Sequence, residues 1–264
     1  MTAGPAFAQR PVPMWNWTGY YVGANLGYSW GEDSGPVALG GAFVVDTRIS
    51  LDGVVGGIQT GYNWQVQNWV YGLEFDFQGT GQKGSASFLC RGGTSATPGG
   101  VNGLCTIGHV GDTIHDPALP ATITLNERLE WFGTVRSRVG VTTAPTFLTY
   151  ITGGLAYGQV KVDTRVQGVN VIGAPGANGA TFTAVDQTFG TTKTQVGFVL
   201  GGGVEGVLAG NWTGRIEYLY VDLGTISGSF ATSLVAPGGG PVIAAFSSHV
   251  TDHIVRVGVS YVFH

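Results

Sequence analysis

The sequence predicts an all-β protein, and more closely an eight-stranded antiparallel up-and-down barrel that crosses a membrane. Wherever the hydrophobic residues recur regularly, they do so at every second position, as in a β-strand. No segment shows the 3.6-residue period of a helix. Eight alternating segments are separated in turn by long and short connections, and their charges share one face. With 46 glycines and only 11% charged residues among 264, the composition is not that of an ordinary soluble surface.

The stretch YYVGANLGYSW at 20–30 shows the alternation most clearly, with large residues on one face and small or polar residues on the other. Each predicted strand is long enough for the ~9–11 residues that a tilted strand needs to cross a bilayer. The phase of one of them, 147–160, is ambiguous. The predicted strands are 20–30, 54–65, 69–78, 129–141, 147–160, 194–208, 212–220 and 249–263.

The connections between these strands alternate in length. Tight turns on one side of the membrane and long loops on the other are the layout of an outer-membrane barrel. We therefore expect short periplasmic turns and four long extracellular loops. The expected turns are 66–68, 142–146 and 209–211, and the expected loops are 31–53, 79–128, 161–193 and 221–248.

Two stretches without formal charge, 139–160 and 223–251, raise the alternative of spanning helices. The first contains Pro145 and several glycines, and the second contains PGGGP at 237–241. Proline and glycine are poor helix formers, so neither stretch suits a spanning helix.

The charged residues within the predicted strands all lie, by parity, on the face opposite the aromatic one. A charge on the lipid face near the bilayer centre costs roughly 2–4 kcal/mol, so we place the apolar face against lipid and the charges in the lumen. A soluble lipocalin-like barrel would have the inverse arrangement and is the alternative fold. The inward charges are Glu74, Asp76, Glu130, Arg136, Arg138, Glu205, Arg215, Glu217, Asp252 and Arg256.

The tetrapeptide NWTG occurs at 16–19 and again at 211–214, and a third Asn-Trp pair begins the strand at Trp69. Asn is expected to close the periplasmic turn and Trp to lie at the boundary between membrane and water. Trp17 is out of phase with Tyr20, so we place it just before the first strand. The predicted periplasmic aromatic girdle is Tyr20, Tyr62, Trp64, Trp69, Tyr71, Trp212, Tyr261 and Phe263.

Four motifs, WNWTGYYVGANLGYSWG, GGLAYG, NWTGRIEYLYVDLG and VRVGVSYVF, resemble the small outer-membrane β-barrel proteins of alphaproteobacteria, the family of 25 and 31 kDa major surface proteins. That family is similar to the transmembrane domain of outer membrane protein A and to the opacity proteins. The resemblance implies an eight-stranded barrel in the outer membrane of a Gram-negative bacterium, inserted by the outer-membrane assembly machinery. Its C-terminal assembly signal maps onto Arg256, Gly258, Tyr261 and Phe263, with His264 as a departure.

The N-terminus contains AFAQ at 6–9, an Ala-x-Ala signal cleavage site without the basic and apolar regions that precede such a site. We therefore predict that 1–8 is the remnant of a signal peptide, 9–16 a periplasmic segment and 17–264 the barrel.

The longest predicted loop holds both cysteines of the chain, Cys90 and Cys105. In an exported chain these predict a disulfide worth about 3 kcal/mol. The same loop contains His109, Asp112, His115 and Asp116, whose spacing could hold a metal, but without a fixed scaffold we predict no metal and no cofactor.

His249 and His253 fall on the outward face near the rim of the last strand. Some eight-stranded barrels are lipid-modifying enzymes that pair a rim histidine with a serine, so Ser247 or Ser248 could take that role. The nearby carboxylate, Asp252, faces inward by parity, and rim polarity explains the histidines, so we predict no catalytic residue and no enzyme.

The inward charges suggest the function. The interior of an eight-stranded barrel is narrow enough to be filled by side chains, and Arg suits a dense bidentate network. We predict a non-enzymatic envelope protein with an occluded lumen and surface-exposed loops, and a small porin as the alternative. Expected partners are outer-membrane lipid, lipopolysaccharide and the assembly machinery. The net charge of −4 argues against binding of nucleic acid. The sequence does not identify ligands of the loops.

Overall fold

A computed structural model describes residues 15–39, 43–90, 109–110, 121–172, 181–236 and 240–264 of the chain. The described residues contain no helix that is long and apolar enough to cross a membrane. The predicted signal-peptide remnant at 1–8 and most of the predicted periplasmic segment lie outside them. The strands are β1 (Gly19–Leu39), β2 (Phe43–Val66), β3 (Trp69–Thr80), β4 (Lys83–Cys90), β5 (His109–Val110), β6 (Ala121–Ala144), β7 (Phe147–Ile172), β8 (Thr181–Ala209), β9 (Trp212–Ala236) and β10 (Gly240–Phe263).

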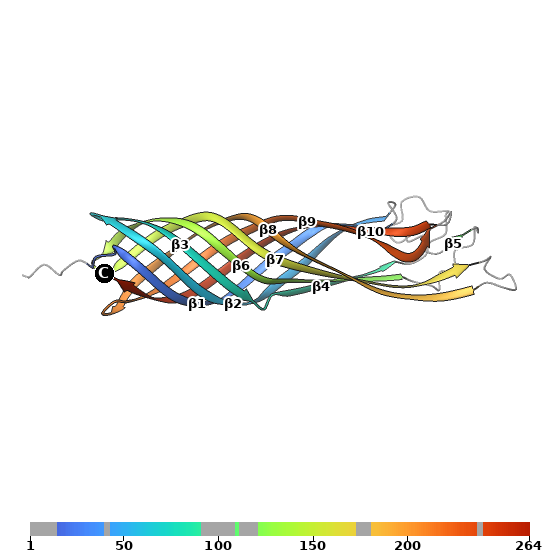
Figure 1. The fold of residues 1–264 in the computed structure, drawn as a ribbon, viewed down its shortest axis with the longest axis horizontal. Helices are drawn as coiled ribbons and strands as arrows, with labels where there is room; N and C mark the ends of the chain where they lie inside the picture. The colour runs from blue at the N-terminus through green and yellow to red at the C-terminus, as the bar shows by residue number, and fades with distance from the viewer. Residues whose placement is uncertain (1–14, 40–42, 91–108, 111–120, 173–180, 237–239) are drawn as a thin grey trace, which may run out of the picture.

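Eight strand positions close into a ring, which confirms the predicted barrel. Pairing is antiparallel from each strand to the next, and β10 pairs back with β1. Where β3 ends, β4 takes its place in the ring and pairs with β6. The two-residue β5 pairs in parallel with the end of β7. Figure 1 shows the tilted strands wound into a tube, with the C-terminus at the end that carries the tight turns.

The tight turns lie where the sequence predicts them. One turn separates β2 from β3 at Gln67, another separates β6 from β7, and the third separates β8 from β9 at Gly210. Gln67 and Gly210 have φ values of 55° and 53°, in the left-handed region that reverses the chain tightly. These turns mark one end of the barrel, and the chain ends beside them.

The predicted long loops are wrong in their bounds, because most of their described residues are strand. β1 continues to Leu39, β7 continues to Ile172, and β8 begins at Thr181, all well inside segments predicted as loops. The strands thus run beyond the barrel into a narrower extension at the end opposite the C-terminus (Figure 1). We call this part the extension.

The ring opens within the extension, leaving two sheets. β8 pairs with β9 only between Phe198 and Ala209, and β2 meets β4 only at Asp52 and Lys83. One sheet therefore has the order β2-β1-β10-β9 and the other β4-β6-β7-β8. The seam between β8 and β9 is bridged by side chains, since the rings of Phe189 and Phe230 stack with centroids 4.1 Å apart.

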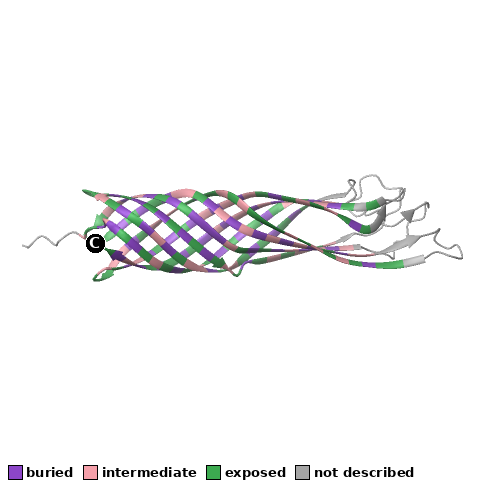
Figure 2. Cartoon of the chain, viewed as in Figure 1, coloured by how far each residue is buried: buried purple, intermediate pink, exposed green. Residues whose placement is uncertain are grey.

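The side-chain polarity of each strand reverses between barrel and extension. In β7, Ile151 and Leu155 are 71% and 60% exposed on the outer wall of the barrel, whereas Val162 and Val166 are buried in the extension. Figure 2 shows the alternation of buried and exposed positions continuing along the strands into the extension. The barrel thus presents apolar side chains outward to lipid, and the extension presents them inward to its own core.

The core of the extension lies between its two sheets and is built from β-branched, leucine and phenylalanine side chains of both. Its buried members include Val37, Ile49, Leu51, Ile123, Leu125, Val162, Val166, Val185, Ile226, Ala244 and Phe246, with Ala86, Phe88 and Phe230 packed against them. This core explains why the extension is strand rather than loop, since alternating residues need an apolar partner face to be buried.

Candidate functional site

The interior of the barrel is layered along its axis. The middle layer contains four acids and four arginines, each at most 4% exposed. They project from β3, β6, β8, β9 and β10 toward the axis, because inward positions recur at every second residue. This charge layer consists of Glu74, Asp76, Arg136, Arg138, Glu205, Arg215, Glu217 and Arg256.

Arg136 lies at the centre of the charge layer. Its Nη1 donates to Glu217 Oε1 at 2.9 Å, and its Nη2 donates to Asp76 Oδ2 at 2.9 Å and also to Glu74. One guanidinium therefore binds three carboxylates from two strands. Its five N–H donors point in fixed directions in one plane, whereas the ammonium group of lysine has three donors on a single atom.

The other three arginines extend the same network. Arg256 Nε donates to Glu217 Oε2 at 2.8 Å, and Arg256 Nη2 donates to Asp76 Oδ2 at 3.0 Å. Arg138 Nη1 donates to Glu205 Oε2 at 2.9 Å, and Arg215 Nη1 donates to Glu74 Oε2 at 2.5 Å. Six of the eight groups thus form one connected set of charge-assisted hydrogen bonds, and the Arg138–Glu205 pair adjoins it, with Arg138 Nη1 4.0 Å from Glu74 Oε2.

Neutral side chains supply further partners to the charge layer. Tyr21 Oη donates to Glu74 Oε2 at 2.6 Å, and Tyr150 Oη donates to Glu217 Oε1 at 3.1 Å. The guanidinium carbon of Arg138 also lies 5.1 and 5.0 Å from the ring centroids of these two tyrosines. The sequence alternation places Tyr21 on the small or polar face of the strand 20–30, which faces the lumen. Its hydrogen bond to the charge layer was not predicted.

Apolar layers lie on both sides of the charge layer. On the periplasmic side, Trp17, Val70 and Leu148 are buried together. On the other side, the next inward positions include Ile254 and Leu219 of the larger core together with the polar Gln78 and Thr134, and Phe132 follows Thr134. The charges are therefore enclosed along the axis as well as around it.

The prediction that Glu130 faces the lumen is wrong. A β-bulge lies between Leu129 and Trp131, where β6 has one more residue than β7, and Glu130 is exposed. The bulge reverses the parity, so Glu127 faces inward instead. Without Glu130, the charge layer has equal numbers of acids and arginines.

Asp252 faces inward as predicted but lies outside the charge layer. Its Oδ2 accepts a hydrogen bond from Gln82 Nε2 at 2.8 Å. It is therefore held by an amide and not by an arginine.

The two tryptophans of the NWTG repeats lie in different places. Trp212 is half exposed on the outer wall, as predicted for the girdle, whereas Trp17 is fully buried inside the barrel, so its predicted place at the membrane boundary is wrong. Its backbone N–H donates to Gln65 Oε1 at 2.7 Å, which turns the chain inward ahead of β1. In the second repeat, Asn211 Nδ2 donates to the carbonyl of Val262 at 3.0 Å and so fixes the turn.

The other residues of the predicted periplasmic girdle lie on the outer wall at the end with the tight turns. Tyr20 lies opposite both Tyr62 and Phe263 in the sheet, and Trp64 lies opposite Tyr71. Tyr261 is half-buried, with its ring centroid 5.3 Å from that of Trp212. In the predicted assembly signal, Arg256 and Gly258 point inward, and Tyr261 and Phe263 point outward. Recognition of this signal by the outer-membrane assembly machinery stays a prediction.

A second aromatic girdle encircles the barrel farther from the periplasm, and the sequence analysis missed it. Ten residues separate Tyr20 from Trp30 along β1, which is about 25 Å of height for a strand tilted by ~40° and matches the apolar band of such barrels. The signal was available as aromatic residues toward the far end of most predicted strands, although the strand 54–65 has none there. This outer girdle contains Trp30, Phe77, Trp131, Tyr157, Tyr218 and His253.

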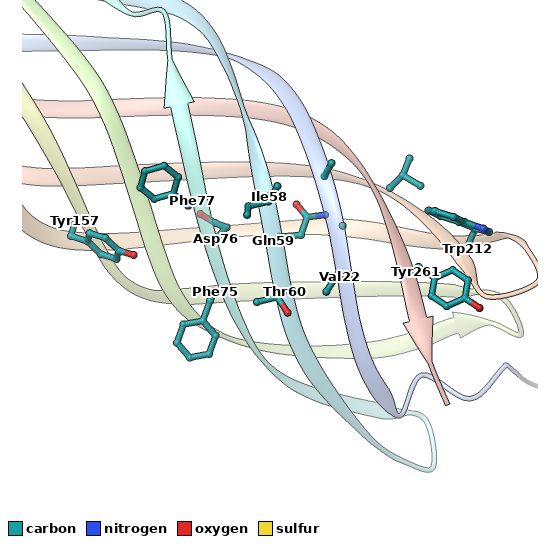
Figure 3. A pocket seen from close by; sticks show the side chains of 13 residues that line it. Val22, Ile58, Gln59, Thr60, Phe75, Asp76, Phe77, Tyr157, Trp212 and Tyr261 are labelled. Carbon is teal, nitrogen blue, oxygen red and sulfur yellow. The ribbon is translucent and has the colours of Figure 1, made fainter.

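Between the girdles the outer wall is apolar, as Figure 3 shows for part of it. Ile58 and Phe75 are 68% and 50% exposed there, while Gln59 and Asp76, one residue away along the same strands, are buried. The hollow among these side chains belongs to the lipid-facing surface and contains no charged group on its outer side.

The two rim histidines point outward, as predicted. His253 stacks on Trp30 with centroids 6.0 Å apart, and its Nδ1 lies 2.7 Å from Tyr218 Oη. His249 Nε2 lies 3.4 Å from Asp222 Oδ2, a carboxylate that the sequence prediction placed in the loop 221–248 and that the structure places in β9. Ser248 points inward, so it does not face either histidine, whereas Ser247 lies on the outward face two residues from His249.

Several predicted site residues cannot be placed. Cys105, Asp112, His115 and Asp116 lie outside the described residues, as do the side chains of Cys90 and His109, so the predicted disulfide stays a prediction. Where side chains are described, no group of three potential metal ligands occurs.

Comparison with known proteins agrees with the architecture. Residues 1–263 match the family model described as outer membrane protein beta-barrel domain. The 31 kDa outer-membrane immunogenic protein of Brucella melitensis biotype 1 is 33% identical over 267 residues, covering 96% of this chain and 86% of that protein. The 22 kDa outer membrane protein of Rhizobium leguminosarum bv. viciae is 30% identical, covering 81% and 68%.

Among solved structures, the outer membrane protease OmpT from Escherichia coli is 12% identical with a TM-score of 0.43, covering 93% of this chain and 97% of that chain. The named relatives and the closed barrel together place this protein in the cell outer membrane. The chain belongs to the outer membrane protein beta-barrel domain family.

Proposed function

We propose that this protein is a non-enzymatic structural barrel with an occluded lumen, which contributes to the envelope and holds its extension at the cell surface. The observation that carries the proposal is the charge layer, in which four acids and four arginines are all buried and hydrogen-bonded to one another. An ion passing through would have to break these bonds in a medium where unpaired charges are costly.

The layers around the charges support the same conclusion. Trp17 and Leu148 lie on the periplasmic side, and Phe132 lies on the other. Apolar constrictions resist wetting, so hydrated ions would meet a second barrier beyond the charges.

Planar-bilayer conductance tests the occlusion. We expect the refolded wild-type protein to be silent and the variant Arg136→Ala/Arg138→Ala to show openings, because removing two cations leaves buried carboxylates that draw in water. The matched control is Arg48→Ala/Arg165→Ala, which removes two exposed arginines and should stay silent. Heat-modifiable gel mobility verifies that every variant is folded.

Steady, ion-selective channels in the wild-type protein would contradict the occlusion and identify a small porin. A folded charge-layer variant that stays as silent as the control would show that the apolar layers alone close the lumen.

The absence of enzymatic activity is part of the proposal. His249 and His253 contact Asp222, Thr225, Tyr218 and aromatic rings on the outer rim, and Ser248 lies on the opposite side of the wall. We expect His249→Ala and His253→Ala to leave the acylation pattern of lipid A unchanged, as read by mass spectrometry of lipid A from expressing cells. A change in acylation seen with either variant and not with Thr251→Ala would make the protein a lipid-modifying enzyme.

A further inference from the structure

A polar groove lies on the outside of the molecule where the barrel joins the extension. It has a volume of about 430 Å³ and forms because β2 and β4 meet only at Asp52 and Lys83 and diverge beyond this pair. Gly84 and Glu127 complete its lining, but the carboxylate of Glu127 points to the interior. The outward side chains that line the groove are Ser50, Lys83, Ser85, Asn126 and Arg128.

The groove is part of a cationic row. Lys83 lies directly opposite Arg128 on β6, and Arg128 lies directly opposite Lys161 on β7. Neighbouring strands are about 4.8 Å apart, so three cations from three strands lie side by side. The arginines of the charge layer lie inside the barrel, whereas Arg128, like Arg48 and Arg165 of the extension, points outward.

Three acids lie near the three cations of the row, but the outward side chains that line the groove itself include two cations and no acid. Asp163 Oδ2 lies 3.7 Å from Arg128 Nη2 and 3.8 Å from Lys161 Nζ, so one carboxylate is shared by two cations. Asp52, opposite Lys83, already accepts a hydrogen bond from Tyr28 Oη at 2.5 Å. Glu130 is exposed nearby, and Lys83 makes no ion pair with the described residues.

The groove lies at the level of lipid head groups. Arg128 and the outer girdle residue Trp131 lie opposite Lys161 and Gln159, two residues apart on β7, so Arg128 is about 7 Å farther along the strand from the periplasm. Since the outer girdle marks the edge of the hydrocarbon, the groove faces the polar zone directly above it.

We propose that this groove binds the phosphorylated sugar head group of an outer-leaflet glycolipid. Lys83 and Arg128 pair with the phosphate, since ammonium and guanidinium groups form strong charge-assisted bonds to phosphate oxygens. Ser50, Ser85 and Asn126 supply hydrogen-bond partners for sugar hydroxyls. The proposal depends on the outer-membrane location and not on whether the lumen conducts.

The test uses the full chain in phosphatidylcholine nanodiscs that contain either bisphosphorylated lipid A or the same lipid A after phosphatase treatment. Lipid retained by the protein is counted by native mass spectrometry. We expect the wild-type protein to retain the phosphorylated form at least tenfold better, and the variant Lys83→Gln/Arg128→Gln to lose this preference. The control Arg48→Gln/Arg165→Gln removes the same charge farther out on the extension and should keep the preference.

Three results would overturn the proposal. They are equal retention of both lipids by the wild-type protein, equal loss in the groove variant and the control, and full displacement of the lipid by millimolar inorganic phosphate. The last would show that the groove takes free phosphate rather than a lipid head group.

Discussion

At the residue scale, a buried cluster in the extension behaves differently from the charge layer. Asp33 and Glu127 are nearly fully buried, and Ser248 Oγ lies within hydrogen-bonding distance of both, 3.2 Å from Glu127 Oε1. Asp33 and Ser248 belong to one sheet of the extension and Glu127 to the other, so the cluster joins the two sheets. Among the residues that the structure describes, no arginine pairs with this cluster, in contrast to the carboxylates of the barrel.

This difference predicts a pH dependence. Burial, followed by the hydrogen bond to Asp33 and the charge of that residue, raises the pKa of Glu127 to about 10. In the unfolded chain its pKa is about 4.3, so the folded state holds one more proton between these values and stability falls as pH rises through that range. The contribution is fully present below about pH 4 and lost above about pH 10.

Glu127→Gln should remove this slope, because an amide keeps a donor without titrating. We expect hydrogen-exchange protection of β6 and β7 in the extension to fall between pH 5 and pH 9 in the wild-type protein and to stay level in the variant. A wild-type protection profile that does not change with pH, or a Gln variant with the same slope, would contradict the role of this carboxyl.

At the element scale, β7 shows how one strand serves two environments. Ile151 and Leu155 face lipid, whereas Val162 and Val166 face the core of the extension, and no break in the strand separates them. The reversal needs no bend, since the inward face stays the same and only the residue types on it change.

The core of the extension should therefore be separable from the barrel. Val166→Asp places an unpaired charge in that core and is expected to unfold the extension, at a cost of several kcal/mol, while the barrel keeps its heat-modifiable mobility. Limited proteolysis of β7 and β8 is the measurement. Thr188→Asp is the matched control, because Thr188 points outward opposite Arg165 and should tolerate the change. Loss of heat-modifiable mobility in Val166→Asp would show that the two parts unfold together.

At the scale of the whole molecule, two interiors of opposite character follow one another along the axis. The barrel encloses balanced charges between apolar layers, and the extension encloses aliphatic and phenylalanine side chains between two sheets. The exterior changes at the same height, from the apolar wall between the girdles to the cationic row of Lys83, Arg128 and Lys161. The surrounding medium thus determines which face of each strand is apolar.

The barrel could be predicted from the sequence because lipid enforces a strict alternation with all charges on one face. The extension could not, because segments such as VKVDTRVQ at 160–167 alternate with the opposite polarity and follow a stretch of glycines. Glu130 was misplaced because LEWF offers a large residue in either phase, and only pairing with β7 reveals the bulge. Trp17 was misplaced because a residue ahead of a strand has no parity to follow.

The reversal of polarity along the strands also gives the protein a single depth of immersion. Sinking by a few residues would carry Lys83 and Arg128 into hydrocarbon, where each charge costs up to roughly 2–4 kcal/mol, and rising would expose Ile58 and Phe75 to water. Free energy as a function of vertical position therefore has one minimum. The height at which the extension stands above the lipid is a property of the barrel wall, so its tip can change in sequence without changing how far it projects.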